Sequence, residues 1–130
     1  MHQNTFLRYA LIADAVASGF TGLLMIAGAD LLTGLLGLPA VLMREAGLLL
    51  IPYVVFVAFV GTRETISRPA VRAIIALNVL WVAGSAVLLV GGWVTPTALG
   101  YAFVSAQAAA VAVFAELQFI GLRRIAAALA

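Results

Sequence analysis

The stretch AVRAIIALNVLWVAGSAVLLV, residues 70–90, decides the fold class of this chain. Arg72 is its one charged residue and Asn78 its one side-chain amide. A helix needs about 20 mostly apolar residues to cross the hydrocarbon core of a bilayer. Residues 70–90 therefore have the length and the composition of a transmembrane helix.

Three further segments of this kind surround it. The four predicted spans cover residues 6–29, 40–61, 70–90 and 97–122. Only short linkers join them, so residues 1–130 form a single domain. We predict an all-α fold, a membrane four-helix bundle whose helices run up-down-up-down. The apolar segment 31–38 is too short to cross and is predicted as an interfacial turn of helix, with Asp30 as its cap.

The composition of the whole chain agrees with a membrane protein and excludes several chemistries. Of the 130 residues, 65% are hydrophobic and 9% are charged, whereas a soluble domain carries about 25% charged residues. The chain has no cysteine, no lysine and one histidine, His2. We therefore expect no cofactor and no metal. The net charge of +2 is too small to predict a nucleic-acid partner; the expected partner is the lipid bilayer.

The arginines indicate how the chain crosses the membrane. Six of them fall on one side of the four spans, namely Arg8, Arg63, Arg68, Arg72, Arg123 and Arg124. Only Arg44 falls on the other side. Because cytoplasmic loops carry an excess of arginine and lysine, both termini are predicted in the cytoplasm (N-in, C-in). Cleavage of the first span as a signal peptide is the alternative, and Asp14 inside its apolar run argues against that.

The two halves of the chain resemble each other. The spacing of Arg8, Asp14 and Gly28 returns in Arg72, Asn78 and Gly92, and the FVGTR of residues 59–63 resembles the FIGLR of residues 119–123. A parallel duplication of a two-helix hairpin would produce this pattern. Chance similarity between apolar sequences is the other explanation.

Three spans carry a polar residue at a similar depth: Asp14, Asn78 and Glu116. Each lies six or seven residues inward of an arginine, which is roughly 9–10 Å along a helix. Charges within spans are costly and are the first candidates for function. One hypothesis is that Asp14 and Glu116 form an acid pair that binds a proton, a cation or a polar head. The other is a structural clasp, in which the arginines reach these side chains.

The helical spacing also predicts which faces point inward. A stripe of small and polar residues on the fourth span is predicted to face the bundle interior: Ser105, Ala109, Ala112 and Glu116. Pro52 removes a hydrogen bond from the second span and is expected to kink it. The hydroxyl of the adjacent Tyr53 would need a partner, which Gln107 or Ser18 could supply. A kink can open a cavity between helices, so Tyr53, Gln107 and Trp81 are further ligand-binding candidates.

On the outer side, Arg44 and Glu45 lie close to the start of the second span. With Asp30 they form a small charge cluster, which is predicted to be an interfacial ion pair rather than a binding site.

The chain resembles a family of small, functionally uncharacterised bacterial integral membrane proteins with four helices. The resemblance rests on REAGL (residues 44–48), LNVLW (77–81), PTALGY (96–101), QA (107–108) and ELQ (116–118). The DoxX-type membrane proteins are similar in size and helix count only. The resemblance implies a bacterial inner-membrane protein and implies no reaction.

The leading functional hypothesis is a non-enzymatic membrane module that binds a lipid-like ligand or partner helices. The alternative is a small transporter or channel component coupled to protons or cations through Asp14 and Glu116. Four helices are few to enclose a transport path, so this alternative requires a homodimer. An enzyme acting on a lipid or quinone through the paired acids is a third hypothesis. The spans contain no thiol and no histidine that would support this third hypothesis.

Overall fold

The computed structural model describes the backbone of residues 2–129 and the side chains of residues 5–128, so the side chain of His2 lies outside the described part. Within it there are five helices and no strand: α1 (His2–Ala27), α2 (Ala29–Leu36), α3 (Ala40–Thr62), α4 (Arg68–Val90) and α5 (Ala98–Leu129). All except α2 are long and apolar enough to cross a membrane. The prediction of an all-α four-helix bundle is confirmed, and the chain is a multi-pass membrane protein.

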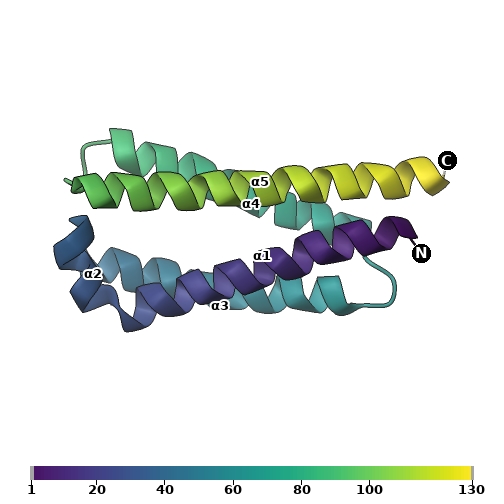
Figure 1. Cartoon of the computed structure of the whole chain (residues 1–130), viewed down its shortest axis with the longest axis horizontal. Helices are drawn as coiled ribbons and strands as arrows, with labels where there is room; N and C mark the ends of the chain where they lie inside the picture. Colours follow the sequence, from purple (N-terminus) through teal and green to yellow (C-terminus); the bar gives the residue numbers. More distant parts are fainter. Residues whose placement is uncertain (1, 130) are drawn as a thin grey trace.

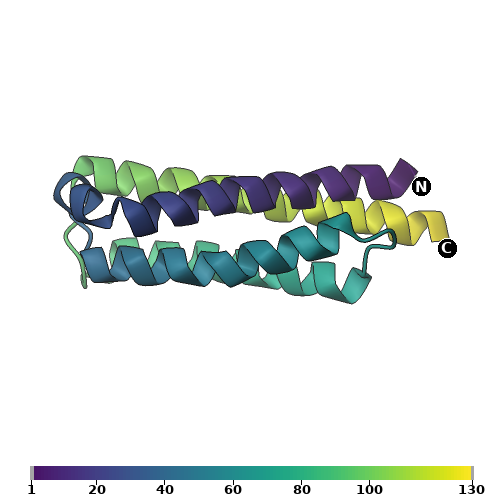
Figure 2. The same cartoon turned by 90° about the horizontal axis from the view of Figure 1, so that it is seen from below.

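The four long helices run antiparallel in sequence order around a square (Figures 1 and 2). Both termini and the loop between α3 and α4 lie at one end, which we call the terminal end. The short helix α2 and the turn between α4 and α5 lie at the opposite end. Helix α1 packs along both α3 and α5, and α4 packs along α5, whereas α3 and α4 touch at only a few positions. The square is therefore closed on three sides and open on the fourth.

Small residues allow α1 to approach its two neighbours closely. A Cβ atom built on Gly47 would lie 2.8 Å from the carbonyl oxygen of Gly22, and one built on Gly121 would lie 3.0 Å from the Cβ of Leu7. Glycine at such contacts is typical of packed membrane helices, where apolar burial gives no driving force and close packing must supply it. The interfaces of α1 with α3 and α5 are therefore tight.

The segment between α1 and α3 forms the predicted interfacial helix, about two residues earlier than expected. Helix α2 ends at Leu36 and is capped by Gly37, which has a φ of 70° and donates its N–H to the carbonyl of Thr33. The prediction that Asp30 caps this helix is wrong, because Gly28 occupies the N-cap position. Asp30 lies in the first turn, where the free N–H groups of a helix favour an acid, and it pairs with Arg44.

At the terminal end, Arg8 ties α1 to the end of α3. Its Nη1 donates to the carbonyl oxygens of Gly61 and Arg63, at 2.6 and 2.7 Å. The last carbonyls of a helix have no partner within it, so Arg8 caps α3. Arg8 therefore does not reach inward toward Asp14, as the clasp hypothesis required.

Candidate ligand-binding groove and its polar floor

The open side of the bundle holds a cavity of about 680 Å³, which we call the groove. Helices α3 and α4 form its two sides, and side chains from α1 and α5 close it at the back. Pocket volumes of about 300–1,000 Å³ are usual for small-molecule sites. The groove therefore has the size of a ligand site and lies within the membrane-spanning part of the bundle.

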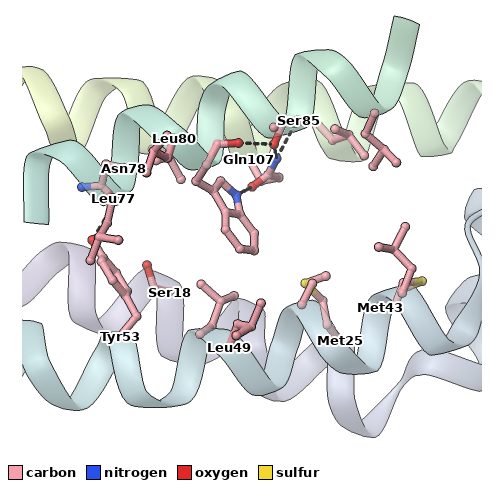
Figure 3. A pocket seen from close by; sticks show the side chains of 18 of the residues that line it. Ser18, Met25, Met43, Leu49, Tyr53, Leu77, Asn78, Leu80, Ser85 and Gln107 are labelled. Atoms are coloured by element: carbon pink, nitrogen blue, oxygen red, sulfur yellow. Dashed lines mark hydrogen bonds between the residues drawn. The ribbon is translucent and has the colours of Figure 1, made fainter. Parts of the chain in front are cut away.

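The lining of the groove is apolar and carries no charge. Its apolar residues include Met25, Leu49, Leu50, Phe56, Leu80, Leu88, Phe103 and Val104. Its polar residues are Ser18, Tyr53, Asn78, Trp81, Ser85 and Gln107. Figure 3 shows Ser18, Leu49 and Tyr53 on one side of the space and Asn78, Leu80, Ser85 and Gln107 on the other. The space extends from Tyr53 and Asn78 toward Met43.

Beneath one end of the groove lies a hydrogen-bonded cluster that we call the polar floor: Asp14, Ser18, Tyr53, Asn78 and Gln118. The Asp14 side chain is fully buried. Its Oδ1 accepts from Ser18 Oγ at 2.9 Å. Its Oδ2 lies 2.6 Å from the Tyr53 hydroxyl and accepts from Gln118 Nε2 at 2.8 Å and from Asn78 Nδ2 at 3.2 Å. One carboxyl group thus joins α1, α3, α4 and α5.

The remaining contacts of the polar floor connect its members to one another. Asn78 Nδ2 also donates to Gln118 Oε1 at 3.0 Å, and the Tyr53 hydroxyl lies 2.7 Å from Asn78 Oδ1. Asp14 and Gln118 are fully enclosed, whereas Tyr53, Asn78 and Ser18 also line the groove. A buried polar network of this kind is stable only when its groups are satisfied. No buried side-chain nitrogen or oxygen among the described residues lacks a partner.

A second network, the polar wall, lies on the α4 and α5 side of the groove and consists of Trp81, Ser85 and Gln107. Trp81 Nε1 donates to Gln107 Oε1 at 2.6 Å, and Gln107 Nε2 donates to Ser85 Oγ at 3.0 Å and to the Val104 carbonyl at 2.8 Å. Ser85 Oγ in turn donates to the Trp81 carbonyl at 2.8 Å. These bonds hold the Trp81 indole in one orientation beside the groove.

The structure brings together five of the six predicted site residues. Asp14, Asn78 and Tyr53 meet in the polar floor, and Trp81 and Gln107 meet in the polar wall. The sixth, Glu116, is exposed on the outer face of α5, so the predicted pairing with Asp14 is wrong. The stripe that begins at Ser105 follows the same outward face. The reason is that another face of α5, with Val104, Gln118 and Gly121, packs into the bundle.

The predicted partners of the Tyr53 hydroxyl were also wrong. Its hydroxyl meets Asp14 and Asn78 instead of Gln107 or Ser18. In the described part of the chain no arginine contacts Asp14, so the polar floor is a clasp made of amides and hydroxyls.

Gln118 is the site residue that the sequence analysis missed. A signal for it was present, because Gln107 and Gln118 are eleven residues apart and eleven residues make just over three full turns of an α-helix. The two amides therefore share one face of α5, and that face contributes both to the wall and to the floor.

Comparisons of the chain with protein families, with curated proteins and with solved structures found no match. The function is therefore inferred from the geometry of the groove alone.

Proposed function

We propose that this protein binds one lipid-like molecule in the groove between α3 and α4. The observation that carries the proposal is the sparse contact between these helices along a cavity of about 680 Å³. An empty apolar space of this size would leave its lining without packing partners, which is unfavourable. An apolar molecule that enters sideways from the bilayer would restore those contacts.

The arrangement of polar residues supports a ligand with an apolar body and a small polar group. Most of the lining is aliphatic or aromatic, and the polar atoms are confined to the floor and the wall. Apolar pockets with a few placed polar groups are typical of small-molecule sites, where the polar groups set the orientation. A partner helix would fill such a groove less well, because its side chains would face the polar floor.

In this proposal the protein resides in a bacterial inner membrane with both termini in the cytoplasm. The arginine-rich terminal end supports this orientation through the positive-inside rule. The resemblance to small bacterial four-helix membrane proteins supports the compartment. The groove then extends from mid-membrane toward the outer leaflet.

The test uses the fluorescence of Trp81, which lines the groove. Trp93→Phe removes the only other tryptophan. In bilayers, dibromostearyl alcohol at low mole fraction is expected to quench Trp81 in a saturable manner. Quenching that only rises in proportion to the mole fraction would mean contact with bulk lipid and would refute the proposal.

Two matched substitutions of glycine by phenylalanine test whether the brominated probe binds in the groove. Gly84 lines the groove, and a Cβ atom built on it meets no atom within 4 Å. Gly84→Phe therefore starts from an unobstructed Cβ position, places an aromatic side chain in the groove and is expected to weaken the saturable phase about tenfold or more. Gly34 is equally unobstructed but lies on α2, away from the groove. Gly34→Phe is expected to leave the quenching unchanged.

The transporter alternative has less support from the geometry. It relied on Asp14 and Glu116 acting together, and Glu116 is exposed on the far side of α5. Proton uptake into liposomes by the parent chain, lost in both Asp14→Asn and Glu116→Gln, is the result that would favour it over ligand binding.

A further inference from the structure

We infer that the polar group of the ligand is a hydrogen-bond donor without negative charge, such as a hydroxyl on a long apolar chain or ring. This inference rests on the proposed function and names the class of ligand. It follows from which polar atoms around the groove remain free to bond. The hydrogens of the polar lining are all engaged within the protein, whereas several of its oxygens retain a lone pair.

In the polar wall, the donor-only indole of Trp81 fixes the direction of every bond. Since indole N–H can only donate, Gln107 must turn its oxygen toward Trp81 and its nitrogen away. Both hydrogens of Gln107 Nε2 are then used, on Ser85 Oγ and on the Val104 carbonyl. The Ser85 hydrogen is used on the Trp81 carbonyl. Gln107 Oε1 and Ser85 Oγ each accept one bond and have a second lone pair.

In the polar floor, the donor hydrogens that border the groove are likewise bonded to acceptors within the protein. Ser18 donates to Asp14 Oδ1, and the two hydrogens of Asn78 Nδ2 go to Asp14 and Gln118. The single hydrogen of the Tyr53 hydroxyl lies toward Asp14 Oδ2 or toward Asn78 Oδ1. In either case it stays within the floor. Among the described floor residues that line the groove, namely Ser18, Tyr53 and Asn78, no donor hydrogen is left to point into it, but Ser18 Oγ can accept.

The charges around the groove disfavour an anionic head group. Among the described side chains, no lysine, arginine or histidine lines the groove, and the ionisable groups of the floor, Asp14 and Tyr53, are acids. A carboxylate or phosphate would be desolvated beside oxygen atoms with no cation to pair with, which is costly. A ketone, ester or ether would find no donor. A hydroxyl can donate to Gln107, Ser85 or Ser18.

The test compares three brominated C18 probes that differ only in the head group, using saturable quenching of Trp81 in Trp93→Phe. The probes are dibromostearyl alcohol, its methyl ether and dibromostearate, at about pH 9, where a carboxylic acid is ionised. One hydrogen bond has a modest net value, so the ether is expected to bind about two- to tenfold more weakly than the alcohol. The carboxylate is expected to bind at least about tenfold more weakly.

Gln107→Met gives a second, independent test of which donors and acceptors around the groove are free to bind the ligand. It removes one acceptor and releases the Trp81 N–H as a free donor, so the preference for the alcohol over the ether is expected to disappear or reverse. Equal binding of all three probes, or tighter binding of the carboxylate, would overturn the inference while leaving the groove as a lipid site. Absence of saturable quenching by every probe would instead refute the proposed function.

Discussion

Replacing Gln118 by methionine tests whether the polar floor holds the four long helices together. Methionine keeps the length of the side chain and its helix preference but removes two hydrogen bonds. These are the bond from Gln118 Nε2 to Asp14 at 2.8 Å and the bond from Asn78 Nδ2 to Gln118 Oε1 at 3.0 Å. Both lie in a fully buried position, so water cannot replace the lost partner.

The expected magnitude follows from the number of bonds and their environment. Hydrogen bonds between membrane helices contribute about 0.6 kcal/mol on average and up to about 1.7 kcal/mol each. Asp14 Oδ2 keeps its contacts with Tyr53 and Asn78, which limits the penalty of leaving it unpaired. We therefore expect Gln118→Met to lower the free energy of unfolding by about 1–3 kcal/mol.

The assay is reversible unfolding in mixed micelles, with SDS as the denaturant and circular dichroism as the signal. Glu116→Met, two residues away on the exposed face of α5, is the matched control. We expect it to leave the unfolding midpoint at or above that of the parent, because no buried bond is lost. The reasoning is refuted if Gln118→Met unfolds like the parent or if Glu116→Met is the more destabilised of the two.

Four further substitutions test other parts of the structure, three of them in the same titration and Arg8→Met by amide hydrogen exchange. Tyr53→Phe keeps the ring and removes the hydroxyl of the polar floor, so the free energy of unfolding is expected to fall by about 1–2 kcal/mol. An unchanged unfolding midpoint would show that the hydroxyl contributes nothing to stability. Gly100→Ala places a Cβ 2.0 Å from the Leu36 carbonyl oxygen and should lower the free energy of unfolding by about 1–3 kcal/mol. Gly84→Ala, whose Cβ meets open space, should raise it by up to about 1 kcal/mol because alanine favours helix more than glycine does. The opposite order of these two would contradict the close approach of Gly100 on α5 to the last residue of α2, Leu36. Arg8→Met leaves the last carbonyls of α3 without a donor, and faster amide hydrogen exchange at the terminal end is the expected result; unchanged exchange there would count against the cap.

The fold could be predicted almost entirely from the sequence. Long apolar runs have to be helices in a bilayer, because no other open structure satisfies the backbone there. The predicted spans match the four long helices to within a few residues at most ends. The largest difference is at the C-terminus, where α5 continues to Leu129 instead of ending near residue 122. Beyond that residue no apolar run was required, and the alanines favour helix.

The faces of the helices were harder to predict than their positions. In a soluble bundle the apolar stripe points inward, but in a membrane protein the lipid-facing surface is as apolar as the interior. Small residues such as Ser105 and Ala109 could therefore face either way, and they face outward. For the same reason, Glu116 was predicted to face the bundle interior and Gln118 was not identified as a site residue.

Asp14 and Asn78 were predicted correctly to lie at one depth inside the bundle, and Tyr53 to need a hydrogen-bond partner, because a polar group inside a span needs a partner wherever it lies. Which partner each one finds depends on the relative rotation and height of helices far apart in sequence. The groove itself had only an indirect signal in Pro52. It arises because the contact between α3 and α4 is missing along much of its length, and that is a property of packing rather than of any one segment.

Anomalous X-ray diffraction from crystals grown with dibromostearyl alcohol tests the central claim most directly, since bromine reports its own position. Ligand binding in the groove predicts a bromine peak between α3 and α4, among Leu49, Leu80 and Trp81, and its loss in Gly84→Phe but not in Gly34→Phe. Bromine found only on the outer, lipid-facing surfaces of the bundle, with the groove filled by the protein's own side chains, would contradict it.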